Sequence, residues 1–143
     1  MELKNKLAVV TGVSKGIGLE VVKLLLEKGS VVAGWGRTAL AFHHPNFHFF
    51  NCDVAVEESV EKAYQETVTN LGADIRILVN NAGFGVAKPF ETMSTEEWKS
   101  MFDTNVHGIF YVSKRLVPAM KAADEGHIIN VASIAGLNGV ANF

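Results

Sequence analysis

The sequence is poor in cysteine, has no long apolar run and carries no excess of basic residues. Its one cysteine, Cys52, excludes an internal disulfide framework and fits a reducing compartment. No apolar run reaches the roughly 18 residues that a membrane-spanning helix needs, and the first residues show no signal-peptide cleavage pattern. A net charge of −2 gives no basic face for nucleic acid. We therefore expect a cytoplasmic protein that binds neither membrane nor nucleic acid.

What the sequence does have is the composition of a globular chain. Its 143 residues suffice for one hydrophobic core, and 48% hydrophobic against 20% charged residues is typical of such a domain. Apolar strand-like runs alternate with helical patterns, which indicates an α/β protein. We predict a single domain over residues 1–143.

Glycines follow the first apolar run. Residues 7–10 predict a buried strand, and Gly12, Gly16 and Gly18 come next, before a helical apolar pattern that starts at Leu19. A strand, a glycine turn and a helix start form a cradle for phosphate or pyrophosphate. Backbone N–H groups at the helix N-terminus point at the anion, and glycines let it approach closely. A glycine turn with a purely structural role is the alternative at this point.

The spacing G-x-x-x-G-x-G behind Thr11 resembles the glycine motif of the short-chain dehydrogenase/reductase family. A second signature of that family, Asn-Asn-Ala-Gly, stands at residues 80–83 after an apolar strand pattern. The resemblance implies that Asp53 and Val54 border the adenine ring, although Asp53 could instead be a turn or helix-capping residue. The two signatures imply these further cofactor contacts: Gly12, Ser14, Lys15, Gly16, Ile17, Gly18, Asn81, Ala82 and Gly83.

The second predicted strand, residues 30–35, ends where the family binds the adenosine ribose. An acidic residue there would bond the ribose 2′-OH of NAD, but this sequence has Gly36 followed by Arg37. An arginine can pair bidentately with a 2′-phosphate, and Lys15 in the glycine loop is a second cation that could reach the same group. Both favour NADP(H) over NAD(H) as the cofactor. Taken alone, Arg37 could also be a solvated residue at a strand end.

Two residues resemble catalytic residues of the family. Asn105 lies amid apolar neighbours in a helical pattern, and the resemblance implies that it holds a water molecule in a proton relay. An exposed or helix-bonded asparagine is the alternative. Ser133 ends the strand predicted within residues 126–136, where a hydroxyl could orient the substrate oxygen for hydride transfer.

The acid/base tyrosine of the family has no counterpart in this sequence. Its Y-x-x-x-K motif is expected after Ser133 at a distance that lies beyond Phe143. The only tyrosines, Tyr64 and Tyr111, both precede Ser133 and do not fit the motif. The resemblance implies a Rossmann-type doubly wound parallel sheet with the strand order 3-2-1-4-5, truncated after the fifth strand. That strand would form an apolar edge, which invites pairing.

The remaining patterns complete the predicted fold. Residues 38–46 are too short for a crossover helix and predict a loop. The histidines His43, His44 and His48 indicate surface residues rather than a metal site. A helix is expected at about 56–71, and Ser94 with Glu97 forms a capping box that opens a long helix to about Lys121. The apolar surface of that helix is wider than one stripe, so a second face could pack on a partner subunit. The alternative is a helix that lies deeper in a single core.

The resemblance implies an enzyme, an NADP-dependent short-chain oxidoreductase. It would transfer a hydride between the nicotinamide and a small-molecule carbonyl or alcohol substrate, and act as a homo-oligomer. Without the tyrosine and lysine of the family, the 143 residues are expected to be inactive alone. Two alternatives stay open: a non-catalytic dinucleotide-binding module, and an inactive truncated remnant.

Overall fold

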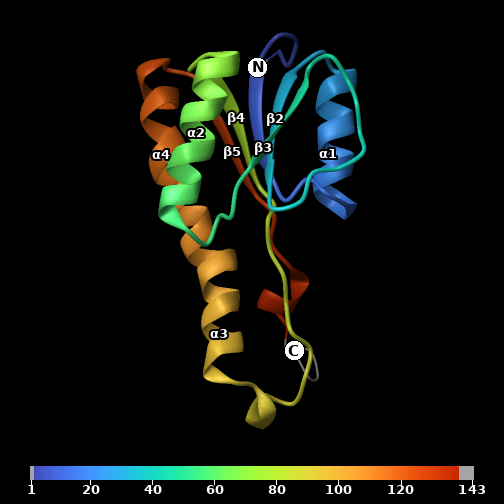
Figure 1. Cartoon of the computed structure of the whole chain (residues 1–143), viewed down its shortest axis with the longest axis vertical. Helices are drawn as coiled ribbons and strands as arrows, with labels where there is room; N and C mark the ends of the chain where they lie inside the picture. The colour runs from blue at the N-terminus through green and yellow to red at the C-terminus, as the bar shows by residue number, and fades with distance from the viewer. Residues whose placement is uncertain (1, 139–143) are drawn as a thin grey trace.

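The computed structural model describes residues 2–138, and these contain one parallel sheet with helices on both faces (Figure 1). The strands lie in the order β3-β2-β1-β4-β5, and all four neighbouring pairs are parallel. This confirms the predicted doubly wound, Rossmann-type arrangement. The strand bounds are β1 (Leu7–Thr11), β2 (Val31–Gly36), β3 (Phe47–Asn51), β4 (Ile75–Asn80) and β5 (His127–Asn130).

The helices form two outer layers. In Figure 1, α1 covers one face of the sheet and α2 and α4 cover the other, while α3 extends past the carboxyl ends of the strands. None of the described helices combines the length and the apolar character that crossing a bilayer requires. The α-helical bounds are α1 (Gly16–Glu27), α2 (Glu57–Leu71), α3 (Thr95–Phe102) and α4 (Gly108–Ala122), with short 3₁₀ turns at Phe90–Thr92 and Ile134–Gly136.

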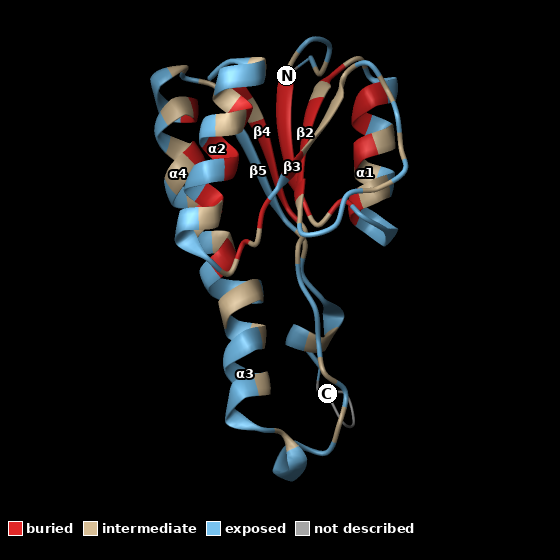
Figure 2. Cartoon of the chain, viewed as in Figure 1, coloured by how far each residue is buried: buried red, intermediate tan, exposed pale blue. Residues whose placement is uncertain are grey.

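The side chains of β1 point alternately to the two faces of the sheet, and both faces are covered, which explains why nearly every residue of this strand is apolar. Leu7 and Val9 point toward α2 and α4, whereas Ala8 and Val10 point toward α1. Successive side chains of a strand face opposite sides of the sheet, so a strand covered on both sides needs apolar residues throughout. Figure 2 shows the resulting buried layer in β1, β2 and β4.

The edge strand β5 differs from the others because all four of its residues are exposed. Ile128 and Ile129 keep 43% and 52% of their surface exposed. The strand ends at Asn130 and is shorter than predicted. Ser133 was expected within it but lies beyond it, as the N-cap of the 3₁₀ turn that starts at Ile134.

The long helix predicted after Ser94 is interrupted. Its start is confirmed, because Ser94 and Glu97 form the complete capping box of α3. Between α3 and α4, however, residues Asp103–His107 form a π-helical segment that the apolar spacing did not predict. The loop predicted at residues 38–46 is confirmed, with no helix assigned there.

Candidate cofactor and active site

A cavity of about 1070 Å³ opens at the carboxyl ends of the strands. Loops that follow all five strands contribute to its walls, as does the helical region around the π segment. A sheet whose strand order reverses at β1 and β4 leaves a crevice there, where doubly wound proteins bind their ligands. The cavity brings together every predicted site residue except Gly18: Gly12, Ser14, Lys15, Gly16, Ile17, Arg37, Asp53, Val54, Asn81, Ala82, Gly83, Asn105 and Ser133.

Gly18 has a packing role below the cavity. A Cβ atom at this position would overlap the Gly12 carbonyl oxygen and the Asn81 side-chain amide. The missing side chain therefore lets α1 approach the loops after β1 and β4. Gly12 and Gly16 serve the turn itself, because their φ angles of +71° and +59° lie in the left-handed region that other residues rarely adopt.

The N-terminus of α1 opens onto the same cavity. Its N-cap residue, Lys15, makes no side-chain hydrogen bond to the first turn, and this fully described turn contains no acidic residue. Backbone N–H groups there are thus left for a ligand, and the helix dipole favours an anion. The glycine loop fits the phosphate cradle that the sequence predicted.

Thr11 and Asn81 fasten the glycine turn to the loop after β4. The Asn81 side-chain amide donates to the carbonyl oxygens of Thr11 and Gly12, both at 3.0 Å. In return, the Thr11 hydroxyl oxygen accepts from the backbone N–H groups of Asn81 and Ala82, again at 3.0 Å. Sequence reasoning did not assign Thr11 to the site. The signal that could have found it is a hydroxyl at the end of an otherwise apolar buried strand.

Asn80, unlike Asn81, forms its side-chain hydrogen bonds with other side chains and not with backbone groups. Its side-chain amide donates to the Asn130 side-chain oxygen at 2.8 Å and to the Ser113 hydroxyl at 3.2 Å. It therefore joins β4 to the edge strand and to α4. The two neighbouring asparagines of the second signature thus make different contacts, and of the two only Asn81 lines the cavity.

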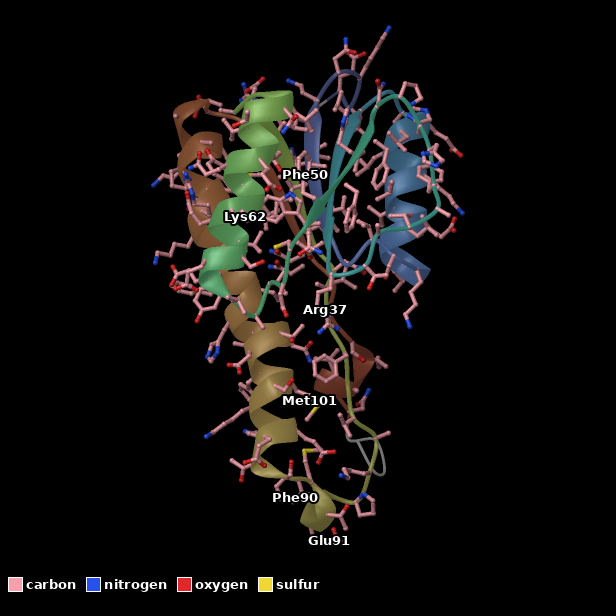
Figure 3. The ribbon with its side chains drawn as sticks, viewed as in Figure 1. Arg37, Phe50, Lys62, Phe90, Glu91 and Met101 are labelled. Atoms are coloured by element: carbon pink, nitrogen blue, oxygen red, sulfur yellow. The ribbon has the colours of Figure 1, made fainter. Side chains whose placement is uncertain are left out.

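The walls near β2 and β3 have space and positive charge. Arg37 is exposed at the carboxyl edge of the sheet (Figure 3), and Lys15 is exposed on the glycine loop. A Cβ atom at Gly36 would have no neighbour closer than 3.7 Å, so this position is open. Asp53 forms a turn, because its carboxylate accepts from the Ala55 N–H at 3.1 Å, while the N-cap of α2 is Val56.

Asn105 holds the chain that follows the second signature. It lies in the π segment, where its side-chain oxygen accepts from the Phe84 N–H at 3.0 Å and its amide donates to the Phe84 carbonyl at 2.7 Å. Met101 of α3 lines the cavity as well (Figure 3). Its sulfur accepts from the Val86 N–H at 3.4 Å. Neither contact was predicted, because both join residues that are distant in sequence.

Ser133 is accessible from the cavity. Its hydroxyl oxygen accepts from the Ala135 N–H at 3.2 Å, which fixes the side chain at the start of the 3₁₀ turn. Neither tyrosine lines the cavity within residues 2–138. Tyr64 is buried with the Arg115 guanidinium 3.6 Å from its ring centre, and Tyr111 lies on α4 against the core. This agrees with the prediction that Tyr111 is not the acid/base residue.

Comparisons with known proteins agree with this geometry. Residues 6–143 match the sequence model of the short chain dehydrogenase family. The chain is 36% identical to the 3-oxoacyl-[acyl-carrier-protein] reductase FabG of Vibrio cholerae, an alignment that covers 99% of this chain and 60% of the relative. It resembles the ligand-free aldohexose dehydrogenase of Thermoplasma acidophilum with a TM-score of 0.86 at 30% identity, covering 92% of this chain and 51% of that one.

A further solved structure is a serine dehydrogenase in complex with NADP⁺. The TM-score is 0.88 at 29% identity, and the alignment covers 95% of this chain and 57% of that one. The chain thus spans about 60% of the length of the curated relatives it matches. The fold, the cavity and these matches lead to one conclusion. The chain belongs to the short-chain dehydrogenase/reductase family of oxidoreductases.

Proposed function

We propose that the protein is an NADP(H)-dependent oxidoreductase that acts on a small carbonyl or alcohol substrate, with residues 1–143 as its single cofactor-binding domain. The observation that carries the choice of cofactor is the pair of exposed cations, Lys15 and Arg37, on a cavity where Gly36 replaces a ribose-binding acid. A 2′-phosphate would find two positive partners there, and no carboxylate at position 36 would repel it. The NADP⁺ complex of the serine dehydrogenase supports the same choice.

The residues on the cavity suit the parts of such a cofactor. The glycine turn and the N-terminus of α1 would bind the pyrophosphate, and Asp53 with Val54 would border the adenine. Asn81, Ala82 and Gly83 would leave room for the nicotinamide, which accepts or supplies the hydride when bound.

Ser133 and Asn105 have different roles in this proposal. The Ser133 hydroxyl donates a hydrogen bond to the substrate oxygen and so orients the carbon that exchanges the hydride. Asn105 keeps the loop after β4 in place through its two hydrogen bonds to Phe84 and supports the proton relay. The proton itself requires an acid/base group, and no tyrosine within the described residues lines the cavity. We infer that the working enzyme obtains this group from outside residues 1–143.

A second candidate is a dinucleotide-binding module without catalysis, because no tyrosine within residues 2–138 lines the cavity. Such a module would bind NADPH through the same residues and show no turnover. The two candidates differ in what Ser133 does, because a binding module has no use for a substrate-orienting hydroxyl.

A pair of variants in the intact protein tests the proposal. Arg37→Asp should reverse the preference from NADPH to NADH, because the carboxylate repels a 2′-phosphate and accepts from ribose hydroxyls. Ser133→Ala should lower turnover by about 10²-fold while NADPH affinity stays unchanged. An unchanged cofactor ratio would contradict the NADP(H) assignment. Binding of NADPH without any turnover in the parent protein would favour the binding module.

We also propose that the protein is a homo-oligomer. Four large apolar residues, spaced four apart along α3, the π segment and α4, are 42% to 57% exposed: Trp98, Phe102, Val106 and Phe110. We name this set the helical stripe. An exposed row of aromatic and aliphatic side chains on one helical region is typical of a surface that packs against another subunit.

A further inference from the structure

Two hydrogen bonds fasten the turn after β2 to the end of β3. The Gly36 carbonyl accepts from the Cys52 N–H at 2.9 Å. One residue later, the Arg37 carbonyl accepts from the side-chain amide of Asn51 at 3.2 Å. Gly36 and Asn51 are the last register partners of the two strands. The side chain of Asn51 therefore extends the pairing of β2 and β3 by one residue, to the backbone of Arg37.

Little else holds this turn. The connection to β3 forms no helix, so no helix N-terminus follows Arg37 and Thr38. The contacts that order the connection lie near its far end, where His44 accepts from the N–H groups of Asn46 and Phe47. Apart from the strand ladder, the Asn51 amide makes the one hydrogen bond to the backbone of Arg37 and Thr38 within residues 2–138.

No partner within the described residues directs the Arg37 side chain. The Arg37 side chain is exposed and forms no ion pair within the described residues. The conformation of its backbone therefore determines the position from which the side chain extends. An arginine binds a phosphate through two parallel N–H···O hydrogen bonds, which require a defined orientation of the guanidinium. A mobile backbone at Arg37 would distribute the guanidinium over many positions and lower the affinity for the phosphate.

We propose that Asn51 is a positioning residue that sets the cofactor preference. By holding the Arg37 carbonyl, it directs the guanidinium toward the 2′-phosphate and so raises the affinity for NADPH relative to NADH. This inference rests on the proposed NADP(H) dependence. NADH has no 2′-phosphate, so its binding should not depend on Asn51.

The test is the dissociation constant of each cofactor, measured by calorimetric titration of the intact protein. Asn51→Ala should weaken NADPH binding about three- to tenfold, the range expected for one hydrogen bond, and change NADH binding less than twofold. Asn51→Asp should weaken NADPH binding at least as much, because a carboxylate cannot donate to the Arg37 carbonyl. The matched control is Asn70→Ala, since Asn70 is also exposed and donates to a backbone carbonyl, that of Glu66 at 2.7 Å on α2.

The outcomes separate this inference from the function on which it rests. Equal weakening of both cofactors, or no weakening, would overturn the role of Asn51 while Arg37→Ala still lowers the preference for NADPH. An Arg37→Ala variant with an unchanged preference would instead overturn the NADP(H) assignment itself. Binding of neither cofactor to the unaltered protein would overturn both.

Discussion

The Cys52 thiol is held in its protonated form by its surroundings. Only 1% of its surface is exposed, although it lines the cavity next to Asp53. Burial, and then the charge of Asp53, raise the pKa of the thiol to about 12, while a hydrogen bond with Ser59 acts in the opposite direction. The thiolate is the nucleophilic form of cysteine, so Cys52 is a packing residue at neutral pH.

This thiol should make stability depend on alkaline pH. The folded chain holds the proton more tightly than the unfolded chain, in which a thiol has a pKa of about 8.5. The stabilisation is therefore complete below about pH 8.5 and is lost as the pH rises toward 12, by about 1.4 kcal/mol per pH unit. In urea unfolding, the native chain should lose about 2 kcal/mol more than Cys52→Ala between pH 8 and pH 10.

The alanine variant serves as its own control for packing. Any cavity that it leaves costs the same at both pH values, so the difference between the two pH values isolates the ionisation. Equal losses in the two chains would show that the thiol does not titrate between the folded and unfolded states as expected.

Single residues divide into those that local sequence could predict and those that it could not. Gly12 and Gly16 were predictable because a turn between a strand and a helix needs their positive φ angles. Asn105 was predicted to matter, but its partner was not, because Phe84 lies 21 residues earlier in the chain. The role of Asn51 has the same origin, since its contact joins two different strands.

At the scale of elements, the sheet could be predicted because both of its faces are covered. Parallel strands buried on two sides read as continuous apolar runs, and the capping box at Ser94 marks the start of α3. The π segment at Asp103–His107 could not be predicted, because a π-helix is defined by i→i+5 backbone hydrogen bonds, which the apolar spacing of a sequence does not report. The end of β5 was placed too late, because small apolar residues continue after Asn130 while the pairing stops.

The Thr11 hydroxyl at the end of β1 accepts two backbone hydrogen bonds from the loop after β4. Thr11→Val preserves the shape of this buried side chain but removes the acceptor for the N–H groups of Asn81 and Ala82. Leaving these donors unpaired should lower the free energy of unfolding by about 2 kcal/mol and weaken cofactor binding, because Asn81 and Ala82 line the cavity.

The control for this substitution is a residue at the amino ends of the strands. Ser30 is fully buried, and its hydroxyl donates to the Leu3 carbonyl at 2.8 Å, far along the sheet from the carboxyl ends of the strands. Ser30→Ala should lower the free energy of unfolding and leave cofactor affinity unchanged. Chemical denaturation and cofactor titration of both variants give the comparison. Equal effects on cofactor affinity would mean that Thr11 acts only through global stability.

At the scale of the whole molecule, two of the exposed apolar surfaces could join subunits. One is the helical stripe on α3, the π segment and α4. The other is the edge strand β5 with Ile128 and Ile129, a strand drawn as exposed in Figure 2. An uncovered apolar edge strand presents both side chains and backbone groups for pairing, so it favours unspecific association. The helical stripe has no free backbone groups and favours the packing of one helical region against another.

These two surfaces can be distinguished by placing one charge on each. Phe102→Lys puts an ammonium group in the middle of the helical stripe, where its burial in a subunit interface would be costly, and it should convert the 143-residue chain to monomers of 15.5 kDa. Leu24→Lys on α1 is the control, because Leu24 is 53% exposed and lies outside both surfaces. Light scattering after size exclusion measures the molar mass of each. If Ile129→Lys dissociates the oligomer and Phe102→Lys does not, the subunits meet through β5, and the interface assigned to the helical stripe is wrong.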